Sequence, residues 1–362
     1  MTTVSDAGQW IDLHCHYADP SFPEAARRET GTDTPVVITD GQADVLIRHD
    51  RTIHFVKGEL AHLMSLDHRL ATMDATGAQI QVISPPSFFY HYHVDGEIGA
   101  RICAMLNDGV FAAVESHPSR FLAMPAVPLQ DCDYAIAELE RVSRLPYVAA
   151  ITIGSNVNGT DLDEPRLLPF FAAAESLDMP IFIHPASSNV AGGDRMKDYF
   201  LRNMVGNPLD TTLVAARLMF SGILDRHPAL KICLSHGAGY LTYAVGRFHR
   251  GYTSHEETHA SGSSDPGDLV RRFYADGIVH SRDGLRFAIS QLGADRLVCG
   301  TDYPFQIGEP DPRTRVQELA LDSPVQRQIL WDNAAAFLRP QALRTSTPAA
   351  ATSQERGIDA HA

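Results

Sequence analysis

The chain has 362 residues, of which 44% are hydrophobic and 20% charged, a composition typical of a soluble globular protein with a sizeable core. Its 30 basic and 44 acidic side chains give a formal net charge of −14, which argues against nucleic acid and anionic membranes as partners. The first residues lack the pattern of a signal peptide, and no apolar stretch approaches the roughly 18 residues of a membrane helix, so a cytoplasmic location without membrane contact is expected.

Short apolar runs alternate with longer amphipathic segments, which predicts repeated βα units around a parallel sheet. Eight runs have the composition of buried parallel strands: 10–16, 79–84, 121–127, 149–154, 180–184, 231–235, 273–278 and 296–300. Helical spacing is found between them at 69–76, 98–117, 134–143, 167–177, 212–226 and 239–250. Eight such units in about 300 residues predict an α/β fold, a (β/α)8 TIM-type barrel. A doubly wound open sheet is the alternative, but it would not need an eighth strand ending in a metal-binding carboxylate.

A single barrel domain is therefore expected over residues 1–340. Residues 19–65 form a long insertion after the first strand, and loops of that length usually act as lids or binding loops. The polar segment 253–267 is expected to be a linker or surface loop. Residues 341–362 contain few large apolar groups and are expected to form a flexible tail.

The first predicted strand ends with His14, Cys15 and His16. Because side chains alternate along a strand, the two histidines should share one face at its carboxyl end, with Cys15 on the opposite face. Two imidazoles on one face can chelate a single ion. An H-x-H pair is a weak signal by itself, because it also arises between chance neighbours.

Three further strands deliver potential ligands to the same end of the barrel. The fifth strand ends in His184, and the sixth and eighth are followed by His236 and Asp302. Taken alone, His184 is better explained as a core histidine that bonds a backbone carbonyl. Because the carboxyl end is the catalytic face of this barrel, five such side chains from four strands make coincidence a poor explanation. Such ligands suit Zn²⁺, Fe²⁺, Co²⁺ or Mn²⁺ and would leave a position open for chemistry.

The aromatic loop after the second strand is expected to wall a pocket through Phe88, Phe89, Tyr90 and Tyr92. His91 and His93 form a second H-x-H pair in this loop. They follow the strand by several residues, so a place in the pocket wall is favoured over a second metal site.

Motifs along the chain resemble the amidohydrolase superfamily, and within it the α-amino-β-carboxymuconate-ε-semialdehyde decarboxylase group. The resemblance runs from about Asp12 to Leu338 and rests on IDLHCH, MDATGAQIQVIS, AVPLQD, FIHPA, GGDRMK, LKICLSHGAGYLTYAVGR, CGTDYPFQIGE and NAAAFL. It implies one divalent metal ion per subunit, usually zinc and in some aromatic-acid relatives manganese. The implied ligands are His14, His16, His184 and Asp302.

The same resemblance assigns roles around the metal. His236 would be the general base toward a water molecule at the metal, a role that suits a side chain able to exchange a proton near pH 7. Arg247 would reach the substrate carboxylate of a neighbouring subunit, which implies a homodimer. Lys57 falls near the place of a second substrate-binding arginine; lysine keeps the charge but loses bidentate carboxylate recognition. Ala186 stands where the group carries a tryptophan, so the departures concern the substrate site and leave the metal centre intact.

The leading hypothesis is a metal-dependent, non-oxidative decarboxylase, a carbon–carbon lyase for a small unsaturated or aromatic carboxylic acid. Asp302 or His236 would handle the proton that replaces CO₂. A metal-dependent hydrolase or hydratase of an amide, ester, lactone or C–C bond is the alternative, although the SHGAG and TDYPF segments favour the decarboxylase branch. A third possibility is a non-enzymatic metal-dependent sensor; the retention of the full ligand set together with His236 argues against it.

Overall fold

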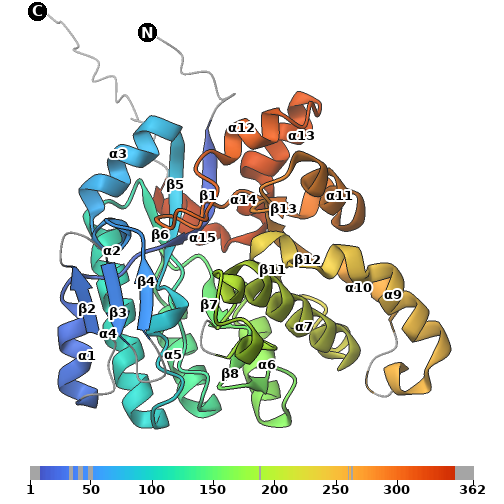
Figure 1. The fold of residues 1–362 in the computed structure, drawn as a ribbon, viewed down its shortest axis with the longest axis horizontal. Coiled ribbons are helices and arrows are strands. Elements are labelled where there is room, and N and C mark those ends of the chain that lie inside the picture. The colour runs from blue at the N-terminus through green and yellow to red at the C-terminus, as the bar shows by residue number, and fades with distance from the viewer. Residues whose placement is uncertain are drawn as a thin grey trace, which may run out of the picture.

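The computed structural model describes residues 9–31, 36–39, 44–47, 52–186, 189–259, 261 and 264–346. Within them the chain forms the predicted barrel of parallel strands with helices around it (Figure 1). The barrel strands are β1 (Trp10–His16), β5 (Ala78–Ser84), β6 (Phe121–Ala123), β7 (Ile151–Gly154), β10 (Ile181–His184), β11 (Ile232–Leu234), β12 (Phe273–Asp276) and β13 (Leu297–Val298). Each of them overlaps one predicted strand, so the predicted fold class is confirmed.

The strands pair as two parallel sheets, with the orders β1-β5-β6 and β13-β12-β11-β10-β7. Single bridges close these sheets into a barrel, one between Ala123 and Val148 and one between Cys15 and Tyr303. Several strands are shorter than predicted. Strand β6 ends at Ala123, and Pro125 follows within the predicted run; proline has no amide hydrogen to donate to a ladder.

Helices surround the barrel, and each predicted helical run overlaps at least one of them. The outer helices include α3 (Leu66–Thr76), α4 (Gly96–Ser116), α5 (Cys132–Ser143), α6 (Leu168–Ser176), α7 (Asn207–Phe220), α8 (Ile223–Arg226), α9 (Leu241–Ser254), α10 (Pro266–Leu269) and α11 (Arg282–Leu292). The predicted helix 212–226 is two helices, because Gly222 between α7 and α8 has a left-handed φ of 75°. None of the helices in the described part of the chain is long and apolar enough to cross a membrane.

The insertion and the carboxyl-terminal segment add smaller elements. Described parts of the 19–65 insertion are α1 (Phe22–Thr30), α2 (Glu59–Leu63) and an antiparallel sheet of β2 (Val36–Thr39), β3 (Asp44–Ile47) and β4 (Thr52–Phe55). After β13 come α12 (Pro312–Gln317), α13 (Ser323–Arg327), α14 (Asn333–Phe337) and α15 (Pro340–Ser346). Residues 347–362 of the predicted tail lie outside the described residues, and so do 260, 262 and 263 of the predicted 253–267 linker.

The barrel interior is filled with apolar side chains and is closed at one end. Buried residues of the strands, among them Leu13, Leu122 and Phe182, form one cluster with Phe337 and Ala342 of α14 and α15. The backbone amide of Arg339, between these two helices, donates to the carbonyl of Ala149 at 2.9 Å, just before β7 begins. Helices α14 and α15 therefore cover the amino ends of the strands, and the carboxyl ends are left for the functional site.

We expect Phe337→Ala to lower the free energy of unfolding by about 3–5 kcal/mol, the usual cost of deleting a buried phenylalanine side chain. The ring is fully buried and its centre lies 5.3 Å from that of Tyr274. The matched control is Phe287→Ala: Phe287 is 43% exposed, and the change should stay within about 0.5 kcal/mol. Denaturant unfolding gives the free energy of unfolding of both variants. A similar loss in the two would contradict the packing of α14 against the closed end of the barrel.

Candidate metal centre

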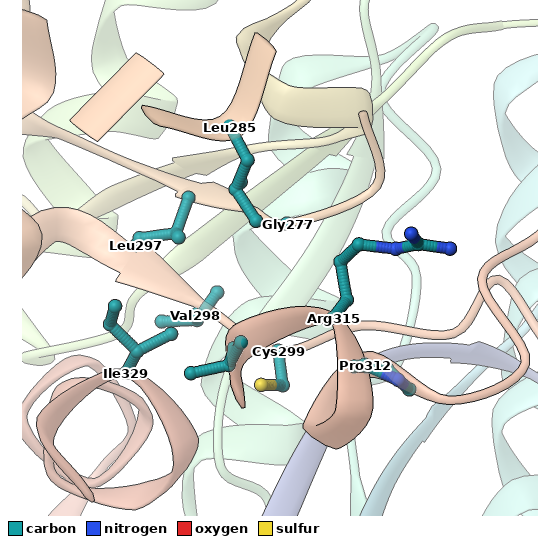
Figure 2. Close-up of a pocket in the computed structure, with 9 residues that line it drawn as sticks. Gly277, Leu285, Leu297, Val298, Cys299, Pro312, Arg315 and Ile329 are labelled. Atoms are coloured by element: carbon teal, nitrogen blue, oxygen red, sulfur yellow. The ribbon is translucent and has the colours of Figure 1, made fainter. Parts of the chain in front are cut away.

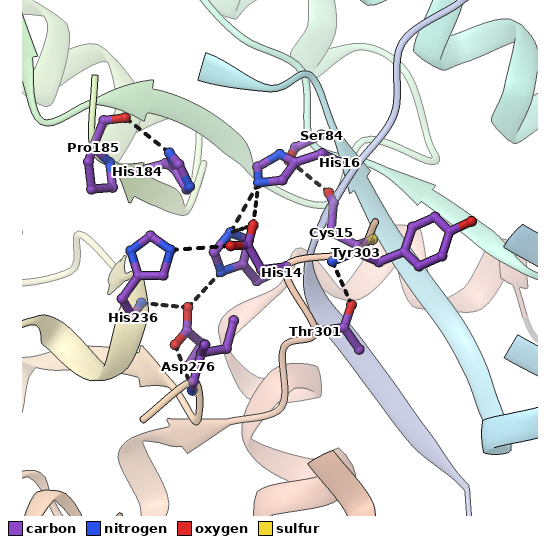
Figure 3. A network of polar contacts seen from close by, with 12 residues as sticks. His14, Cys15, His16, Ser84, His184, Pro185, His236, Asp276, Thr301 and Tyr303 are labelled. Carbon is purple, nitrogen blue, oxygen red and sulfur yellow. Dashed lines mark hydrogen bonds and ion pairs between the residues drawn. The ribbon is translucent and has the colours of Figure 1, made fainter. Parts of the chain in front are cut away.

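Four side chains from three separate segments of the chain converge at the carboxyl end of the barrel. Figure 3 shows the three histidines among them. His14 and His16 belong to β1, His184 is the last residue of β10, and Asp302 lies in the segment that follows β13. All four are buried, and one potential ligand atom from each lies within 4.8 Å of all the others. The structure thus brings together the four side chains that the family resemblance names as ligands.

The potential ligand atoms of these residues point at one another. His14 Nε2 lies 3.2 Å from His16 Nε2, and Asp302 Oδ1 lies 3.3 Å from the former and 3.0 Å from the latter. Asp302 Oδ1 is buried and has no hydrogen-bond partner within the described part of the chain. Imidazole nitrogens and a carboxylate oxygen directed at one point form a donor set that suits a divalent ion such as zinc or manganese.

Acceptors behind the rings fix which nitrogen of each histidine is available. The Nδ1 atoms of His14 and His184 lie 2.7 Å from Asp276 Oδ2 and 3.1 Å from the Pro185 carbonyl oxygen. His16 Nδ1 lies 3.3 Å from the hydroxyl oxygen of Ser84, which itself donates to the carbonyl of Cys15. Because these Nδ1 atoms face acceptors, they carry the hydrogens, and the Nε2 lone pairs remain for a metal.

The electrostatics of the site favour a bound cation. Burial, together with the charges of His16 and His236, holds the pKa of His184 well below its usual range, so its ring is neutral near pH 7. Burial acts to lower the pKa of His14, but the carboxylates of Asp302 and Asp276 outweigh it and raise this pKa to about 10. A proton therefore occupies the metal-free site, and a divalent cation would displace it.

Asp276 is a site residue that the sequence analysis missed. It is the last residue of β12 and is fully buried. Besides its contact with His14, its Oδ2 accepts from the backbone amide of His236 at 2.9 Å, and its Oδ1 accepts from that of Gly237 at 2.9 Å. The predicted strand continued to residue 278, which hid the carboxylate inside a run. Because β12 in fact ends at Asp276, this residue is a polar side chain at the carboxyl end of an apolar strand, which is the pattern that identified His184.

Asp276→Asn should weaken metal binding about 10- to 100-fold, the usual effect of losing a carboxylate that orients a histidine ligand. The amide would no longer supply a charged acceptor for His14 Nδ1. Glu138→Gln is the matched control, since Glu138 is also a buried carboxylate but contacts Asn107 and Arg141 on the outer helices. Competition with a chelator of known affinity gives both dissociation constants; equal values for Asp276→Asn and the unchanged protein would contradict this role.

His236 lies beside the four residues and faces them. Its Nε2 is 3.6 Å from Asp302 Oδ2, and its ring centre is 5.1 Å from that of His184. It follows β11 in a tight turn that ends at Gly239, where φ is 62° and a Cβ atom would lie only 2.1 Å from the carbonyl oxygen of Pro208. The side chain is 15% exposed, unlike the more buried ligand candidates, so it can exchange protons with a molecule at the open side of the site.

Comparisons with known proteins identify the family of the chain. The family model described as amidohydrolase matches residues 11–339. The chain belongs to the amidohydrolase family. Its relatives include the 2-amino-3-carboxymuconate-6-semialdehyde decarboxylase of Dictyostelium discoideum, 32% identical over 75% of this chain and 76% of the relative. The gamma-resorcylate decarboxylase of Rhizobium radiobacter is 31% identical over 66% of this chain and 77% of the relative.

A solved structure supports the same fold. The 5-carboxyvanillate decarboxylase of Novosphingobium aromaticivorans, complexed with manganese and 4-hydroxy-3-methoxy-5-nitrobenzoic acid, matches with a TM-score of 0.76. It is 23% identical, and the match covers 93% of this chain and 99% of the other. The amidohydrolase described here therefore has the same barrel architecture.

An aromatic wall adjoins the metal centre of this amidohydrolase. The ring of Phe305 lies 5.6 Å from that of His16 and 5.9 Å from that of Phe55, which it stacks on. Phe88, a predicted wall residue, lies 5.6 Å from Phe55 and is buried. Phe55 and Phe305 were not singled out from the sequence, although Phe305 stands in the TDYPF segment. The insertion thus contributes one ring to the surroundings of the site.

The remaining predicted wall and substrate residues have different surroundings. Tyr90 is buried and its hydroxyl lies 2.8 Å from the hydroxyl of Thr152, and Ala186 is buried with its amide donating to Ser155 at 3.1 Å. Lys57 lies exposed in the turn before α2 and Arg247 exposed on α9. Within the described residues, His91 and His93 belong to no group able to hold a metal.

A separate small pocket lies where β13 meets the helices α11 and α12 (Figure 2). Its lining is mostly apolar and comes from β13, α11, α12 and the residues before α14: Leu285, Val298, Cys299, Val316 and Ile329. None of the four ligand candidates lines it. The pocket is therefore distinct from the metal centre.

Proposed function

We propose that this amidohydrolase is a metal-dependent, non-oxidative decarboxylase, a carbon–carbon lyase for small aromatic or unsaturated carboxylic acids. The observation that carries the proposal is the buried set of three histidines and one aspartate at the carboxyl end of the barrel. The relatives that support it are decarboxylases of an amino-carboxymuconate semialdehyde and of a resorcylate. Their names give the reaction class, and the aromatic wall beside His16 gives a surface against which a planar ring packs.

The reaction places defined demands on the residues of the site. The bond between the carboxylate carbon and the substrate carbon breaks, its electron pair stays on the substrate carbon, and that carbon takes up one proton. His236 and Asp302 lie where a proton can be held and moved, at Nε2 of the imidazole and Oδ2 of the carboxylate, 3.6 Å apart. The divalent ion, when bound, supplies Lewis acidity and a template for the substrate's oxygen donors. The ring of Phe305, which lies 5.6 Å from that of His16, would limit the access of water on this side of the site.

Metal identity, substrate capture and assembly complete the proposal. One divalent ion binds per subunit, and zinc is the preferred candidate because three of the four ligands are nitrogen donors. Manganese is the second candidate, supported by the manganese complex of the Novosphingobium relative. Arg247 and Lys57 are exposed cations, and we assign them to the substrate carboxylate. Arg247 would serve the site of a second copy, so the enzyme would work as a homodimer.

The proposal is tested by incubating the metal-loaded protein with a panel of acids that includes 2,6-dihydroxybenzoate and 5-carboxyvanillate. We expect one CO₂ per organic product, and in D₂O one deuterium at the carbon that carried the carboxylate. A hydrolase would instead release a second organic fragment without CO₂. That result with amide, ester or lactone substrates, combined with no CO₂ from any acid, would contradict the proposal.

A further inference from the structure

Arg69 of α3 is a fully buried cation that no acidic side chain contacts within the described part of the chain. Arginine stays charged in proteins, and buried charges are rare unless they are paired. Its Nη1 donates to Gln81 Oε1 at 2.9 Å, its Nη2 donates to the backbone carbonyl of His16, and its Nε has no hydrogen-bond partner among the described residues. Such an arrangement is costly to maintain, so its contacts call for a functional explanation.

The guanidinium contacts two of the three chain segments that carry ligand candidates, β1 and the segment after β13. Its carbonyl acceptor belongs to His16, itself a ligand candidate. Its central carbon lies 4.5 Å from the ring centre of Tyr303, the residue after Asp302, which is the geometry of a cation–π contact. The backbone of the same two segments is paired, since the His16 amide donates to the Tyr303 carbonyl at 2.8 Å.

Asp302 needs to be held because its backbone is strained. Its φ is 56°, a left-handed value that costs energy for a residue other than glycine and persists only where neighbours fix it. Asp12 fixes the preceding residue: it accepts from the Thr301 amide at 3.0 Å and from the Thr301 hydroxyl at 2.6 Å. The ring contact with Arg69 fixes the following residue, Tyr303.

One polar chain connects these two anchors. Gln81 of β5 donates to Asp12 Oδ2 at 2.9 Å and accepts from Arg69 through its other amide atom. A neutral amide therefore links the carboxylate that holds Thr301 to the cation that packs on Tyr303. The network thus holds the residues before and after Asp302, Thr301 and Tyr303, and it also holds the carbonyl of His16.

We propose that Arg69 is a positioning residue for the metal centre. It holds His16 and the Asp302 turn in the geometry in which their ligand atoms converge, and it does so without contacting the ion or the substrate. The inference rests on the metal centre of the proposed function and extends it to a residue outside the ligand set. It predicts that Arg69 controls metal affinity and ligand geometry more than it controls global stability.

The test compares Arg69→Met and Arg69→Lys with Arg339→Met. Arg339 is the matched control because it is also buried and donates to two backbone carbonyls, those of Val148 and Ser143, at the closed end of the barrel. We expect Arg69→Met to weaken Zn²⁺ binding about 10- to 100-fold in chelator competition, as loss of a residue that orients ligands does. The Zn²⁺ affinity of Arg69→Lys should lie between those of Arg69→Met and the unchanged protein, because lysine keeps the charge but lacks the planar guanidinium that donates in two directions. Arg339→Met should bind Zn²⁺ within threefold of the unchanged protein.

A spectrum and a second pair of variants keep the test decisive. Cobalt loaded into Arg69→Met should show a shifted visible absorption band, whereas cobalt in Arg339→Met should not. If Arg69→Met does not fold, Gln81→Leu and Tyr303→Leu remove two of the side chains that Arg69 contacts, one at a time, and each should weaken Zn²⁺ binding. Unchanged affinity and an unchanged cobalt spectrum in folded Arg69→Met, or unchanged affinity in both second variants, would overturn the inference. Absence of Zn²⁺ binding by the unchanged protein would instead contradict the proposed function.

Discussion

Asp302→Ala should lose the metal ion and with it the decarboxylase activity. The carboxylate is the one anionic group among the four ligand candidates, and its Oδ1 lies within 3.3 Å of both ligand nitrogens of β1. Loss of a residue that only orients a ligand weakens metal binding roughly 10- to 100-fold, and loss of a ligand itself should cost more, so we expect the affinity to fall by more than about 100-fold. Elemental analysis of the purified variant should find less than a tenth of the metal of the unchanged protein, and CO₂ release should be lost in proportion.

Two further variants separate the ligand role from other causes. Asp302→Asn keeps the size of the side chain but not its charge, and it should also lose most of the metal. Asp283→Ala removes a carboxylate that is 82% exposed on α11, and it should change neither metal content nor activity. Unchanged metal content in both Asp302 variants would exclude this residue as a ligand and remove the basis of the proposed site.

His236→Asn should keep the metal and lose most of the turnover. If the imidazole moves the proton that replaces CO₂, its loss should lower kcat by about 10²- to 10⁴-fold, the usual contribution of a general acid or base. Asparagine suits this position because the backbone φ of His236 is 54°, a value that asparagine tolerates better than most residues. Steady-state CO₂ release gives kcat, and elemental analysis confirms the metal content.

The neighbouring loop supplies the control for this variant. His280 follows β12, has a similar φ of 56° and is 47% exposed. His280→Asn therefore repeats the substitution on the same rim of the barrel without touching the proposed proton path. Its kcat should stay within twofold. A His236→Asn enzyme with full turnover, or one whose lost turnover parallels lost metal, would contradict a role in proton transfer.

The sequence predicted the barrel and the convergence of the ligands for a simple geometric reason. Parallel strands in a barrel all end on the same side, so a polar side chain at the end of an apolar run has a defined place even when its partners are far away in sequence. His14, His184 and Asp302 follow this rule. The family resemblance then separated the four ligand candidates from His236, which the strand rule alone could not do.

Other parts of the site could not be predicted because they depend on strand ends and on packing between distant segments. Asp276 was hidden because the predicted strand was two residues too long. Arg69 lay in an amphipathic run, where an arginine ordinarily faces solvent, and only the packing of α3 against β1 and Tyr303 reveals its burial. Phe55 reaches Phe305 through a long insertion whose path no local pattern specifies.

The central claim is that one divalent ion is held by His14, His16, His184 and Asp302, and anomalous diffraction from crystals loaded with Zn²⁺ tests it most directly. We expect a single strong peak at the zinc edge, about 2.0–2.2 Å from one nitrogen of each histidine and from an oxygen of Asp302. A peak elsewhere in the molecule, or a peak that any of the four side chains fails to reach, would contradict it.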